Sequence, residues 1–456
     1  MIHIKQCENI KIQIMKNILI LGAGLSASSM IAYLLKQASV NQWKVAVGDV
    51  SEETAAAKVS GYDLARSFRF DVEDQKQLKT EVSKADVVIS MLPARFHPVV
   101  AAECLAQSKH MATASYISPE MKAMDADVRK KGLLFLNEIG VDPGIDHMSA
   151  LRVINEIKKQ GGKLLSFESS TGGLVAPESD NNPWNYKFSW NPRNVVLAGQ
   201  GVSKFLQNGQ FKYIPYHSLF SRIDKTTVPS YGDFEIYANR DSLKYRESYG
   251  LQDIQTMFRG TMRRPGYCAG WNVFVQLGMT DDTWIMEGSE KMSWREYVNS
   301  FLPYDEKLSV EEKLCAAMGF SRESETMQRL KWLGIFSHEP IGLKDASPAR
   351  ILQKILEEKW VLGPEDKDMI VMQHRFVYEL GSVRRTRTST LVVIGQDPVH
   401  TAMSITVGIP LAIAVKMLML GQIQLRGVQM PSSPDIYEPV LKELEEYGVK
   451  FSEEEN

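Results

Sequence analysis

A glycine-rich turn near the amino terminus has the composition of a nucleotide-binding loop. The segment Gly22-Ala23-Gly24-Leu25-Ser26-Ala27 has GxGxxA spacing and directly follows the apolar run 18–21. Glycines at these positions permit a tight turn and let backbone amides approach a pyrophosphate, whose charge the amino terminus of the next helix stabilises. The small Ala27 lets that helix pack closely on the strand. We therefore predict a dinucleotide site lined by Gly22, Ala23, Gly24 and Leu25.

Asp49 ends the next apolar run and is the second residue with a clear chemical use. A carboxylate at the end of the second strand can accept hydrogen bonds from the ribose hydroxyls of NAD, and it repels the 2′-phosphate of NADP. The sequence therefore favours NAD, with NADP as the less favoured cofactor. An alternative stays open, because an aspartate here can also cap the helix that starts near Ser51.

Three later segments place polar residues and glycines where further strands end. They are Met91-Leu92-Pro93, Thr113-Ala114-Ser115-Tyr116 and Gly140-Val141-Asp142-Pro143-Gly144-Ile145-Asp146-His147. Ligands of doubly wound sheets bind at such carboxyl ends. Since proline and glycine mark turns in every protein, each segment is also compatible with an ordinary loop. For Tyr116 and Asp142 both interpretations stay open at this point.

The elements that would position these residues alternate between short apolar runs and helical stretches. This alternation is typical of a parallel sheet with crossover helices, and it predicts a doubly wound (Rossmann) α/β dinucleotide domain. The predicted strands are Ile18–Leu21, Lys44–Gly48, Arg69–Val72, Asp86–Leu92, His110–Ala114 and Leu133–Glu138.

After Gly140 the pattern changes to longer aromatic and glycine-containing stretches, which predict a mixed α+β domain. A helical insertion interrupts it between about 293 and 360, where Ser309 and Glu312 form a capping-box pattern and Ser347-Pro348 an amino-terminal cap. Strand character then returns in two runs across a Gly381-Ser382 turn. These runs are Met369–Glu379 and Val383–Gly395.

The remaining carboxyl-terminal residues predict one helix and a solvated end. Thr401–Leu420 is apolar over a length that could cross a membrane, but it contains Lys416 and Pro410, so we predict a buried helix that packs on the first domain. The acidic residues Glu453–Glu455 have the composition of a solvated terminus.

Composition narrows the classes of partner. The chain has 456 residues, 44% hydrophobic and 24% charged, with a formal net charge of -2. This length predicts more than one domain, and the charge gives no long-range attraction for nucleic acid or an anionic membrane, so a small-molecule substrate is expected. The eight histidines show no paired ligand spacing, and no metal site is predicted. The cysteines form no CxxC pair, which fits a reducing cytoplasm. They are Cys7, Cys104, Cys268 and Cys315.

Several longer motifs resemble the glutamate-forming saccharopine dehydrogenase family, whose members are also called saccharopine reductases. The run from Asn137 to His147 is the most specific, and the similarity extends over nearly the whole chain after Met15. The other matching segments are Pro177-Glu178-Ser179, Tyr186-Lys187-Phe188-Ser189-Trp190, Arg259-Gly260-Thr261-Met262-Arg263, Arg387-Thr388-Ser389-Thr390 and Arg426-Gly427-Val428.

The resemblance implies a homodimer and a division into three domains. A nucleotide domain would comprise residues 15–140 completed by 398–430. A substrate-binding and dimerisation domain would comprise 141–285 with 365–397, and a helical insertion domain 286–364. Met15 opens the run 15–21 that would form the first strand, so residues 1–14 are expected to be a non-essential extension.

The resemblance also implies the functional residues. The cofactor would contact Gly22, Ala23, Gly24, Leu25, Asp49, Asp71, Val72, Met91, Thr113, Ala114, Gly140, Val141, Asp142 and Trp190. Saccharopine would contact Ser115, Tyr116, Asp142, Arg240, Thr261, Met262 and Arg263. At the position of Asp49 the NADP-using fungal members resemble one another in having arginine, so this chain departs from them there.

The residue types agree with the implied reaction, in which a secondary amine is oxidised by hydride transfer to a nicotinamide and the resulting imine is hydrolysed. Saccharopine has three carboxylates, which arginines such as Arg240 and Arg263 bind well, although either arginine is also compatible with a surface ion pair. Three residues are candidates for moving protons: Tyr116, Asp142 and His147.

Other functions are compatible with the same sequence. One alternative is an enzyme like carboxynorspermidine dehydrogenase or homospermidine synthase, whose polyamine substrates would favour acidic residues where this chain has arginines. Another is a regulatory protein that binds NAD without catalysis.

Overall fold

The computed structural model describes residues 15–456 and divides into two compact units. The first unit extends to Gly140 and resumes at Leu411–Pro431, and the second comprises Val141–Pro410 and Ser432–Asn456. The predicted extension of residues 1–14, including Cys7, lies outside the described residues.

The first unit contains a seven-stranded sheet in which every pair of neighbouring strands is parallel. The strand order is β15-β6-β5-β4-β1-β2-β3, so the chain runs outward from β1 in both directions and the predicted doubly wound fold is confirmed. The strands are β1 (Asn17–Leu21), β2 (Lys44–Asp49), β3 (Ala65–Arg69), β4 (Val87–Ser90), β5 (His110–Ala112), β6 (Leu134–Leu136) and β15 (Gly427–Gln429).

Helices connect these strands, as crossover connections between parallel strands require. They are α1 (Ser28–Asn41), α2 (Glu52–Val59), α3 (Gln75–Ser83), α4 (His97–Ala106), α5 (Pro119–Ala123) and α6 (Asp125–Lys130), with short 3₁₀ turns η1 (Leu25–Ala27) and η2 (Ala94–Phe96).

Two strands of this sheet differ from the sequence prediction. The strand predicted at Arg69–Val72 begins earlier, at Ala65, because β3 is an edge strand whose residues are only half-buried. The apolar residues that suggested the later position, Phe70 and Val72, follow the strand and pack into the core of the unit. The second difference is β15, a three-residue strand that pairs with β6 and has no apolar run of its own.

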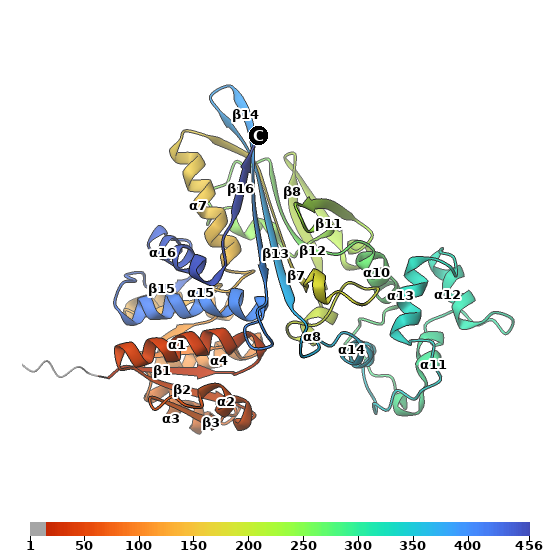
Figure 1. Ribbon diagram of the computed structural model, residues 1–456, viewed down its shortest axis with the longest axis horizontal. Coiled ribbons are helices and arrows are strands. Elements are labelled where there is room, and N and C mark those ends of the chain that lie inside the picture. Colours follow the sequence, from red (N-terminus) through yellow and green to blue (C-terminus); the bar gives the residue numbers. More distant parts are fainter. Residues whose placement is uncertain (1–14) are drawn as a thin grey trace, which may run out of the picture. The chain divides into compact units, whose positions relative to one another are not determined.

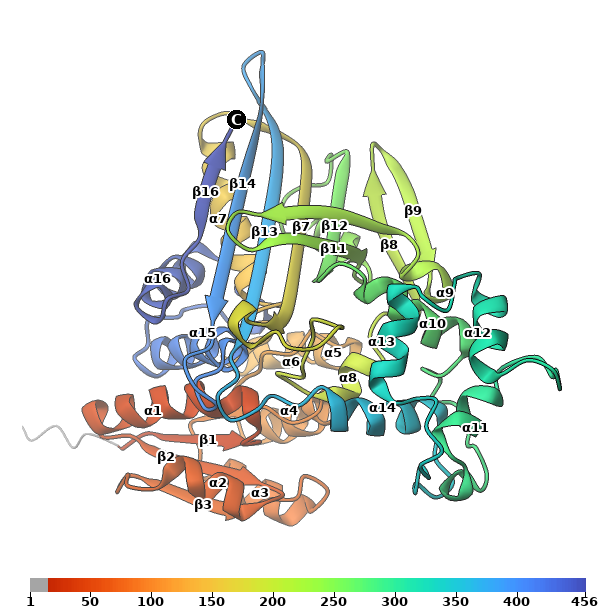
Figure 2. The same cartoon turned by 45° about the vertical axis from the view of Figure 1, so that its right-hand side comes forward.

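The second unit is built on a nine-stranded mixed sheet, as predicted. Its order is β10-β11-β12-β7-β13-β14-β16, with the β8–β9 hairpin attached to β12, and only the β12–β7 pair is parallel. Figure 2 shows β7, β13 and β14 running side by side. The strands are β7 (Lys163–Val175), β8 (Val202–Gln207), β9 (Gln210–Pro215), β10 (Ile223–Val228), β11 (Gly232–Ala238), β12 (Thr256–Arg263), β13 (Asp368–Leu380), β14 (Val383–Ile394) and β16 (Ser452–Glu455).

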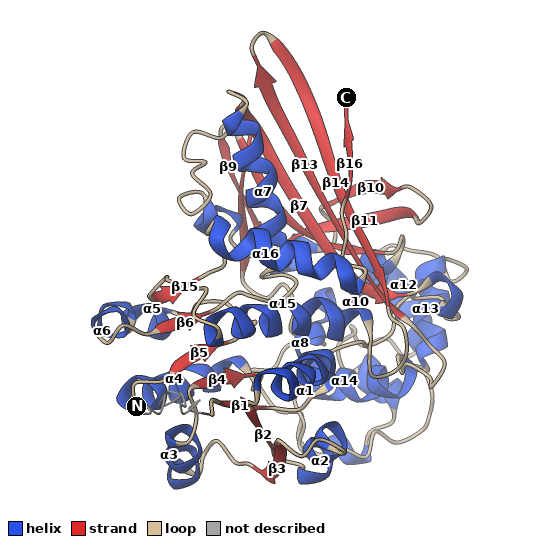
Figure 3. Ribbon diagram, turned by 60° about the vertical axis from the view of Figure 1, so that its left-hand side comes forward, coloured by secondary structure: helices blue, strands red, loops and turns tan. Residues whose placement is uncertain are grey.

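Helices cover this sheet and extend from it. Helix α7 (Ile145–Lys159) packs on β7 and β13, and α16 (Pro434–Leu444) packs on α7 (Figure 3). Near the sheet, α8 (Pro192–Val196), α9 (Tyr216–Leu219) and α10 (Tyr267–Leu277) precede the insertion, with 3₁₀ turns η3 (Pro177–Ser179) and η4 (Ser242–Tyr245).

The predicted helical insertion contains α11 (Trp294–Asn299), α12 (Val310–Met318), α13 (Glu325–Leu333) and α14 (Pro348–Lys359), which Figure 1 shows next to one another. Ser309 and Glu312 form the predicted capping box at the start of α12. The Ser347 side chain caps α14, with Pro348 at its first position. These helices and the sheet share one core, in which Trp184, Trp271 and Trp360 are fully buried.

The apolar helix α15 (Ala402–Met419) begins in the second unit and ends in the first. Among the described residues it is the one helix long and apolar enough to cross a membrane, but 83% of it is buried inside the protein, in agreement with the predicted core helix. Both carboxylate oxygens of Asp368 accept amide hydrogens at its start, from Ala402 and Met403. Near its end the Lys416 ammonium lies 5.6 Å from the centre of the Tyr33 ring.

The acidic carboxyl terminus is exposed, as predicted for a solvated end, and it also forms a strand that was not predicted. Strand β16 pairs antiparallel with β14, and the Glu455 carboxylate accepts hydrogen bonds from Arg385 at 2.8 Å and from Arg387 at 2.7 Å. These bonds hold the pKa of Glu455 at about 2. The strand was not predicted because ion pairs with a strand more than sixty residues away cannot be inferred from the local charge run.

Candidate functional site

The glycine-rich turn lies at the carboxyl edge of the first sheet, between β1 and α1. Gly22 has a φ of +99°, and a Cβ atom there would come within 2.9 Å of the Met91 carbonyl. Glycine is therefore required for the turn to pack against the end of β4. At Gly24 a Cβ atom would meet nothing within 4 Å, so open space lies in front of this residue. The loop thus has the form that a pyrophosphate needs, with backbone that a ligand can approach.

Asp49 is tied to this loop and does not cap the following helix. Its Oδ2 accepts a hydrogen bond from the Ala23 amide at 2.6 Å, and its Oδ1 accepts one from the Ser51 amide at 3.1 Å. The cap of α2 is Ser51, whose side chain accepts from the amide of Thr54. The alternative role as a helix cap is therefore wrong. The carboxylate lies half-buried beside the predicted pyrophosphate loop, where an adenosine ribose would be expected.

The other cofactor residues predicted in the first unit follow the ends of neighbouring strands. Met91 and Thr113 come after β4 and β5, and their amides bond to Leu21 and Leu136 on the adjacent strands. Ala114 follows Thr113, and Gly140 ends the segment after β6. Because these strands are parallel, their carboxyl ends share one edge of the sheet with the glycine-rich turn.

The two residues predicted after β3 differ in exposure. The Asp71 carboxylate is exposed and accepts from the Glu73 amide at 2.9 Å. Val72 is 8% exposed and packs in the core of the first unit, so its side chain contributes mainly to the packing of that core.

A buried histidine that sequence reasoning missed supports the segment with Ser115 and Tyr116. His97 Nδ1 lies 2.8 Å from the Ser90 hydroxyl, and its Nε2 lies 2.7 Å from the Ser115 hydroxyl. Burial lowers the pKa of His97 to about 4, so the imidazole is neutral at physiological pH. One ring nitrogen therefore accepts a hydrogen bond and the other donates one. In this way the imidazole links the Ser115 hydroxyl to Ser90, the last residue of β4. The sequence around His97 contains no recognisable motif. Its partner Ser115 was predicted as a substrate contact only through the resemblance to the saccharopine dehydrogenase family.

Glu138 completes this support from the end of β6. Its carboxylate accepts a hydrogen bond from the Ile117 amide at 2.9 Å, and its own amide donates to the Ser115 carbonyl at 3.0 Å. The half-buried Tyr116 is therefore held between two residues whose backbones are anchored to β6. A φ of +55° at Glu138, unusual for a residue with a side chain, marks this connection.

In the second unit, Asp142 belongs to a buried cluster of charged groups at the start of α7. Arg259 on β12 bonds to Asp142 at 2.5 Å and to Asp146 at 2.7 Å. A cis peptide bond links Asp142 to Pro143, and the Gly144 amide donates to Asp146 at 2.6 Å. The sequence prediction included Asp142 but missed Arg259 as its partner, although Arg259 opens one of the resembling segments.

His147, predicted to handle protons, is fully buried behind this cluster. Its Nδ1 lies 2.5 Å from the Tyr249 hydroxyl and 3.6 Å from the Asp146 carboxylate, and its ring packs 4.6 Å from the Tyr245 ring. With no exposed surface, the imidazole is placed to support the cluster from inside.

The predicted substrate residues on β12 lie on both faces of the strand. Successive side chains alternate along a strand, so Arg259, Thr261 and Arg263 share one face, while Met262 points to the other and is fully buried. The same face continues on β7, where Thr261 is in register with Thr171. Gly172 on β7 is needed for close packing, since a Cβ atom there would come within 2.7 Å of the Met262 carbonyl.

Arg263 is enclosed by aromatic rings. Its guanidinium lies 5.1 Å from the ring of Tyr186, 5.8 Å from that of Tyr237 and 5.2 Å from that of Tyr267. The residue is only 4% exposed, and its Nε has no hydrogen-bond partner among the described residues. A buried guanidinium with a donor to spare fits a carboxylate ligand, because an unmet buried donor is costly.

The last two predicted residues are more open. Arg240 is exposed just after β11, with a φ of +49°, and its carbonyl accepts from the Lys204 amide. Trp190 is half-buried against the core of the second unit. Val141 is 8% exposed at the first position of this unit.

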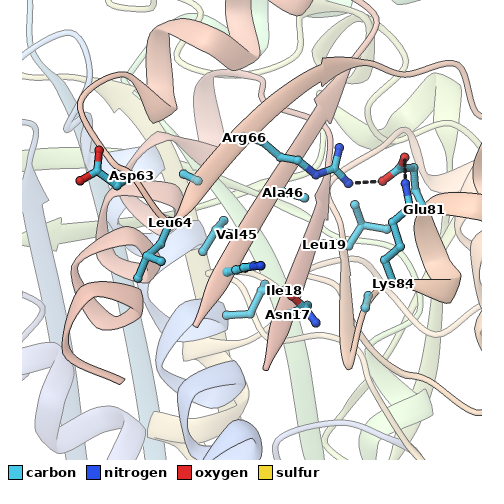
Figure 4. A pocket seen from close by; sticks show the side chains of 13 residues that line it. Asn17, Ile18, Leu19, Val45, Ala46, Asp63, Leu64, Arg66, Glu81 and Lys84 are labelled. Carbon is cyan, nitrogen blue, oxygen red and sulfur yellow. Dashed lines mark hydrogen bonds and ion pairs between the residues drawn. The ribbon is translucent and has the colours of Figure 1, made fainter. Parts of the chain in front are cut away.

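A separate cavity of about 420 Å³ lies at the other edge of the first sheet (Figure 4). It is lined by Asn17, Lys44 and Ala65, the first residues of β1, β2 and β3, and by Arg66, which points to Glu81. Because ligands of doubly wound sheets bind at the carboxyl ends, this cavity does not belong to the predicted cofactor site.

Comparison with known proteins gives family matches over both units. Residues 18–136 match the saccharopine dehydrogenase NADP-binding domain, and residues 140–449 match the saccharopine dehydrogenase C-terminal domain. The chain is 35% identical to saccharopine dehydrogenase [NADP(+), L-glutamate-forming] of Saccharomyces cerevisiae, over 96% of this chain and 99% of the relative. It is 33% identical to the mitochondrial alpha-aminoadipic semialdehyde synthase of Bos taurus, of which it spans 47%.

A solved structure agrees with the sequence matches. Apo saccharopine dehydrogenase (L-Glu forming) from Saccharomyces cerevisiae superposes with a TM-score of 0.86 at 33% identity, covering 97% of this chain and all of that one.

Proposed function

The chain belongs to the saccharopine dehydrogenase family, and on that premise we propose that it is an L-glutamate-forming saccharopine dehydrogenase. The observation that carries the proposal is the extent of the match, which includes 96% of this chain and 99% of an enzyme with that activity in its name. Both units therefore have a counterpart in an oxidoreductase of lysine metabolism.

The proposed reaction oxidises the secondary amine of saccharopine. A hydride leaves the carbon next to nitrogen, the amine proton leaves nitrogen, and an imine forms. Water adds to the imine and the carbon–nitrogen bond breaks, which gives L-glutamate and L-2-aminoadipate 6-semialdehyde. One dinucleotide is reduced, the amine proton is the one proton released overall, and the reaction is reversible.

The residues described above suit this chemistry. Arg263 offers an unmet donor to one of the three substrate carboxylates, and Arg240 is accessible to another. The Ser115 hydroxyl is oriented by His97 to bind the substrate. Asp142 and Tyr116 would move the amine proton and activate water, with His147 supporting Asp142 through Asp146. In this assignment the arginines bind the substrate carboxylates, and Asp142 lies next to the substrate amine.

A nicotinamide dinucleotide supplies the hydride acceptor when bound, and the open space at Gly24 fits its pyrophosphate. For this chain we propose NAD. The fungal relatives are named for NADP(+), as is the matching nucleotide-binding domain. In this protein, however, the Asp49 carboxylate lies beside the pyrophosphate loop, where it can accept from ribose hydroxyls and repels an added phosphate.

The function is tested by following absorbance of the reduced nicotinamide with saccharopine and either NAD or NADP. We expect reduction that depends on saccharopine, and the reverse reaction with L-glutamate plus the semialdehyde. Carboxynorspermidine serves as the comparison substrate for the polyamine enzymes. We expect little turnover because one of its limbs ends in a cationic amine, which the arginines proposed to bind the carboxylates of saccharopine would repel. Turnover of the polyamine substrate alone, or dinucleotide binding without turnover of any substrate, would contradict the proposal.

A further inference from the structure

Arg259 joins two acidic side chains in the interior of the second unit. Its Nη2 atom donates to Asp142 Oδ1 at 2.5 Å and to Asp146 Oδ2 at 2.7 Å. The side chains of Arg259 and Asp146 are 4% and 2% exposed, whereas the side chain of Asp142 is 14% exposed. Asp142 is therefore the member of this cluster that reaches the surface, and the other two lie behind it.

Asp142 and Asp146 bond to the same nitrogen of one guanidinium. Two carboxylates share one guanidinium, and burying charge is costly unless each group is paired. Asp146 is held twice, by Arg259 and by the Gly144 amide. The Tyr245 ring lies 4.8 Å from the guanidinium and holds it in place without adding charge. Asp142 is thus the more exposed carboxylate of the two, and it is the one that a cationic ligand group such as a protonated amine would meet.

We propose that Arg259 is a positioning residue for amine oxidation, which aims the Asp142 carboxylate and keeps it ionised while Asp146 competes for the same guanidinium. The inference rests on the proposed function, because the amine is the group that Asp142 would serve. The two carboxylates then have different roles. Asp142 acts on the ligand, and Asp146 weakens the interaction of Arg259 with Asp142 by bonding to the same guanidinium.

Charged and titratable groups from several elements face this cluster. Asp146 and His147 lie on α7, and Tyr249 bonds to His147. On η4, the Lys244 ammonium lies 4.6 Å from the centre of the Tyr245 ring. His374 on β13 interacts electrostatically with Asp142 and Arg259 and also with Arg152 of α7. Burial lowers the pKa of His374 to about 3, so this imidazole adds no charge at neutral pH. Arg259 contacts Asp142 directly, at 2.5 Å.

The test compares the acidic limb of the pH profile of kcat/KM for saccharopine in three proteins. In Arg259→Gln the two carboxylates lose their shared cation, so we expect the limb to move upward by about 1–2 pH units. In Asp146→Asn the guanidinium serves Asp142 alone, so the limb should move downward by about one unit or less. Shifts in opposite directions distinguish positioning from a general loss of structure, which would lower activity without moving the limb.

Two further variants complete the design. Arg259→Lys keeps the positive charge, so its acidic limb should lie between those of the wild type and Arg259→Gln. Arg375→Gln removes an exposed arginine of the same sheet, paired with Glu168 at 3.3 Å, and should leave the limb unmoved. If Arg259→Gln does not fold, the Asp146→Asn and Arg259→Lys shifts still decide. Unmoved limbs in the active variants, or shifts in the same direction, would overturn the inference.

A readout without turnover separates this inference from the proposed function. The carboxyl ¹³C resonance of Asp142, assigned by its loss in Asp142→Asn, reports the same titration in a protein of any activity. A wild-type protein inactive on saccharopine would contradict the proposed function, while the opposite shifts of this resonance in Arg259→Gln and Asp146→Asn would still support the inference. Identical titrations in all variants would overturn it.

Discussion

In the proposed function, the choice between NAD and NADP depends mainly on Asp49. Both of its oxygens are fixed by backbone amides, from Ala23 and Ser51, so the carboxylate cannot turn away from a ligand at the loop without losing these bonds. A 2′-phosphate would bring like charges together in a partly desolvated place. A repulsion of about 3 kcal/mol corresponds to a preference for NAD on the order of a hundredfold.

The variant Asp49→Arg should reverse or flatten this preference, because a guanidinium can pair with the phosphate and cannot accept from ribose hydroxyls. The measurement is the ratio of kcat/KM for NAD and NADP in both proteins. As a control, Asp63→Arg makes the same change of charge at the far edge of the sheet and should leave the ratio unchanged. A wild-type preference for NADP would contradict the role given to Asp49.

Arg263 supports a prediction about the substrate. Replacing it with alanine should raise the Michaelis constant for saccharopine about tenfold or more, since losing one partner of a buried charged pair costs roughly 2–5 kcal/mol. The affinity for NAD should change little. The adjacent Arg264→Ala is the matched control, because Arg264 packs on Phe234 and bonds to the Tyr231 carbonyl. Equal effects of both variants on saccharopine would count against Arg263.

At the scale of elements, ion pairs attach the edge strand β16 to β14 in the second sheet. Arg387 on β14 is 8% exposed and contacts Glu455 and Glu453 of β16 and Glu156 of α7. The variant Arg387→Gln should lower the free energy of unfolding by about 1–2 kcal/mol. This value is reduced from that of a fully buried pair because the carboxylates are partly exposed.

Urea unfolding of both proteins at low and high salt measures this effect. The control is again Arg375→Gln, whose exposed ion pair should contribute less than about 0.5 kcal/mol. A loss no larger than that of the control would mean that β16 is held by its backbone pairing alone.

Elements with a strong local pattern were predictable from the sequence. The glycine-rich turn, the capping box of α12 and the hairpin of β13 and β14 follow from residue spacing within a few positions. Strands that depend on distant partners were not predictable. Strand β15 is three residues long and exists because β6 offers it an edge, and β16 exists because Arg385 and Arg387 bind its glutamates.

The candidate site shows the same division. Asp49 and Asp142 stand out through their positions after strands, whereas Arg259 and His97 act through partners that the fold supplies. Ser115 lies 18 residues from His97 in the chain, and Asp142 lies 117 residues from Arg259. No local pattern contains such pairs. The homodimer and the three-domain division stay predictions, as do the individual site roles.

For the whole molecule, the buried histidines predict sensitivity to mild acid. Burial lowers the pKa of His97 to about 4 and that of His374 to about 3, and it also lowers that of His110. In the unfolded chain each would titrate near the ordinary value of about 6.5. Because the folded pKa values are the lower ones, the unfolded state binds more protons as the pH falls. Stability is therefore complete above about pH 6.5 and declines as the pH falls toward the folded values.

The pH range in which the histidines lower the stability differs from the range in which the carboxylates do. Hydrogen bonds from Arg295 to Glu311, and from Arg385 and Arg387 to Glu455, hold the pKa values of both glutamates at about 2. Their stabilisation is present above the unfolded value of about 4.5 and is lost only below it. Between about pH 6.5 and 4.5 the loss should come mainly from histidines, at up to about 1.4 kcal/mol per pH unit for each.

The free energy of unfolding in urea, measured at several pH values across this window, should fall by roughly 4 kcal/mol for His97 and His374 together. His374→Gln should reduce the slope by up to about 1.4 kcal/mol per pH unit, because an amide can bond to Ser149 and Ser169 without titrating. His217→Gln, at an exposed position, should leave the slope unchanged. A stability independent of pH in this window would mean that these imidazoles are protonated or reach water in the folded protein.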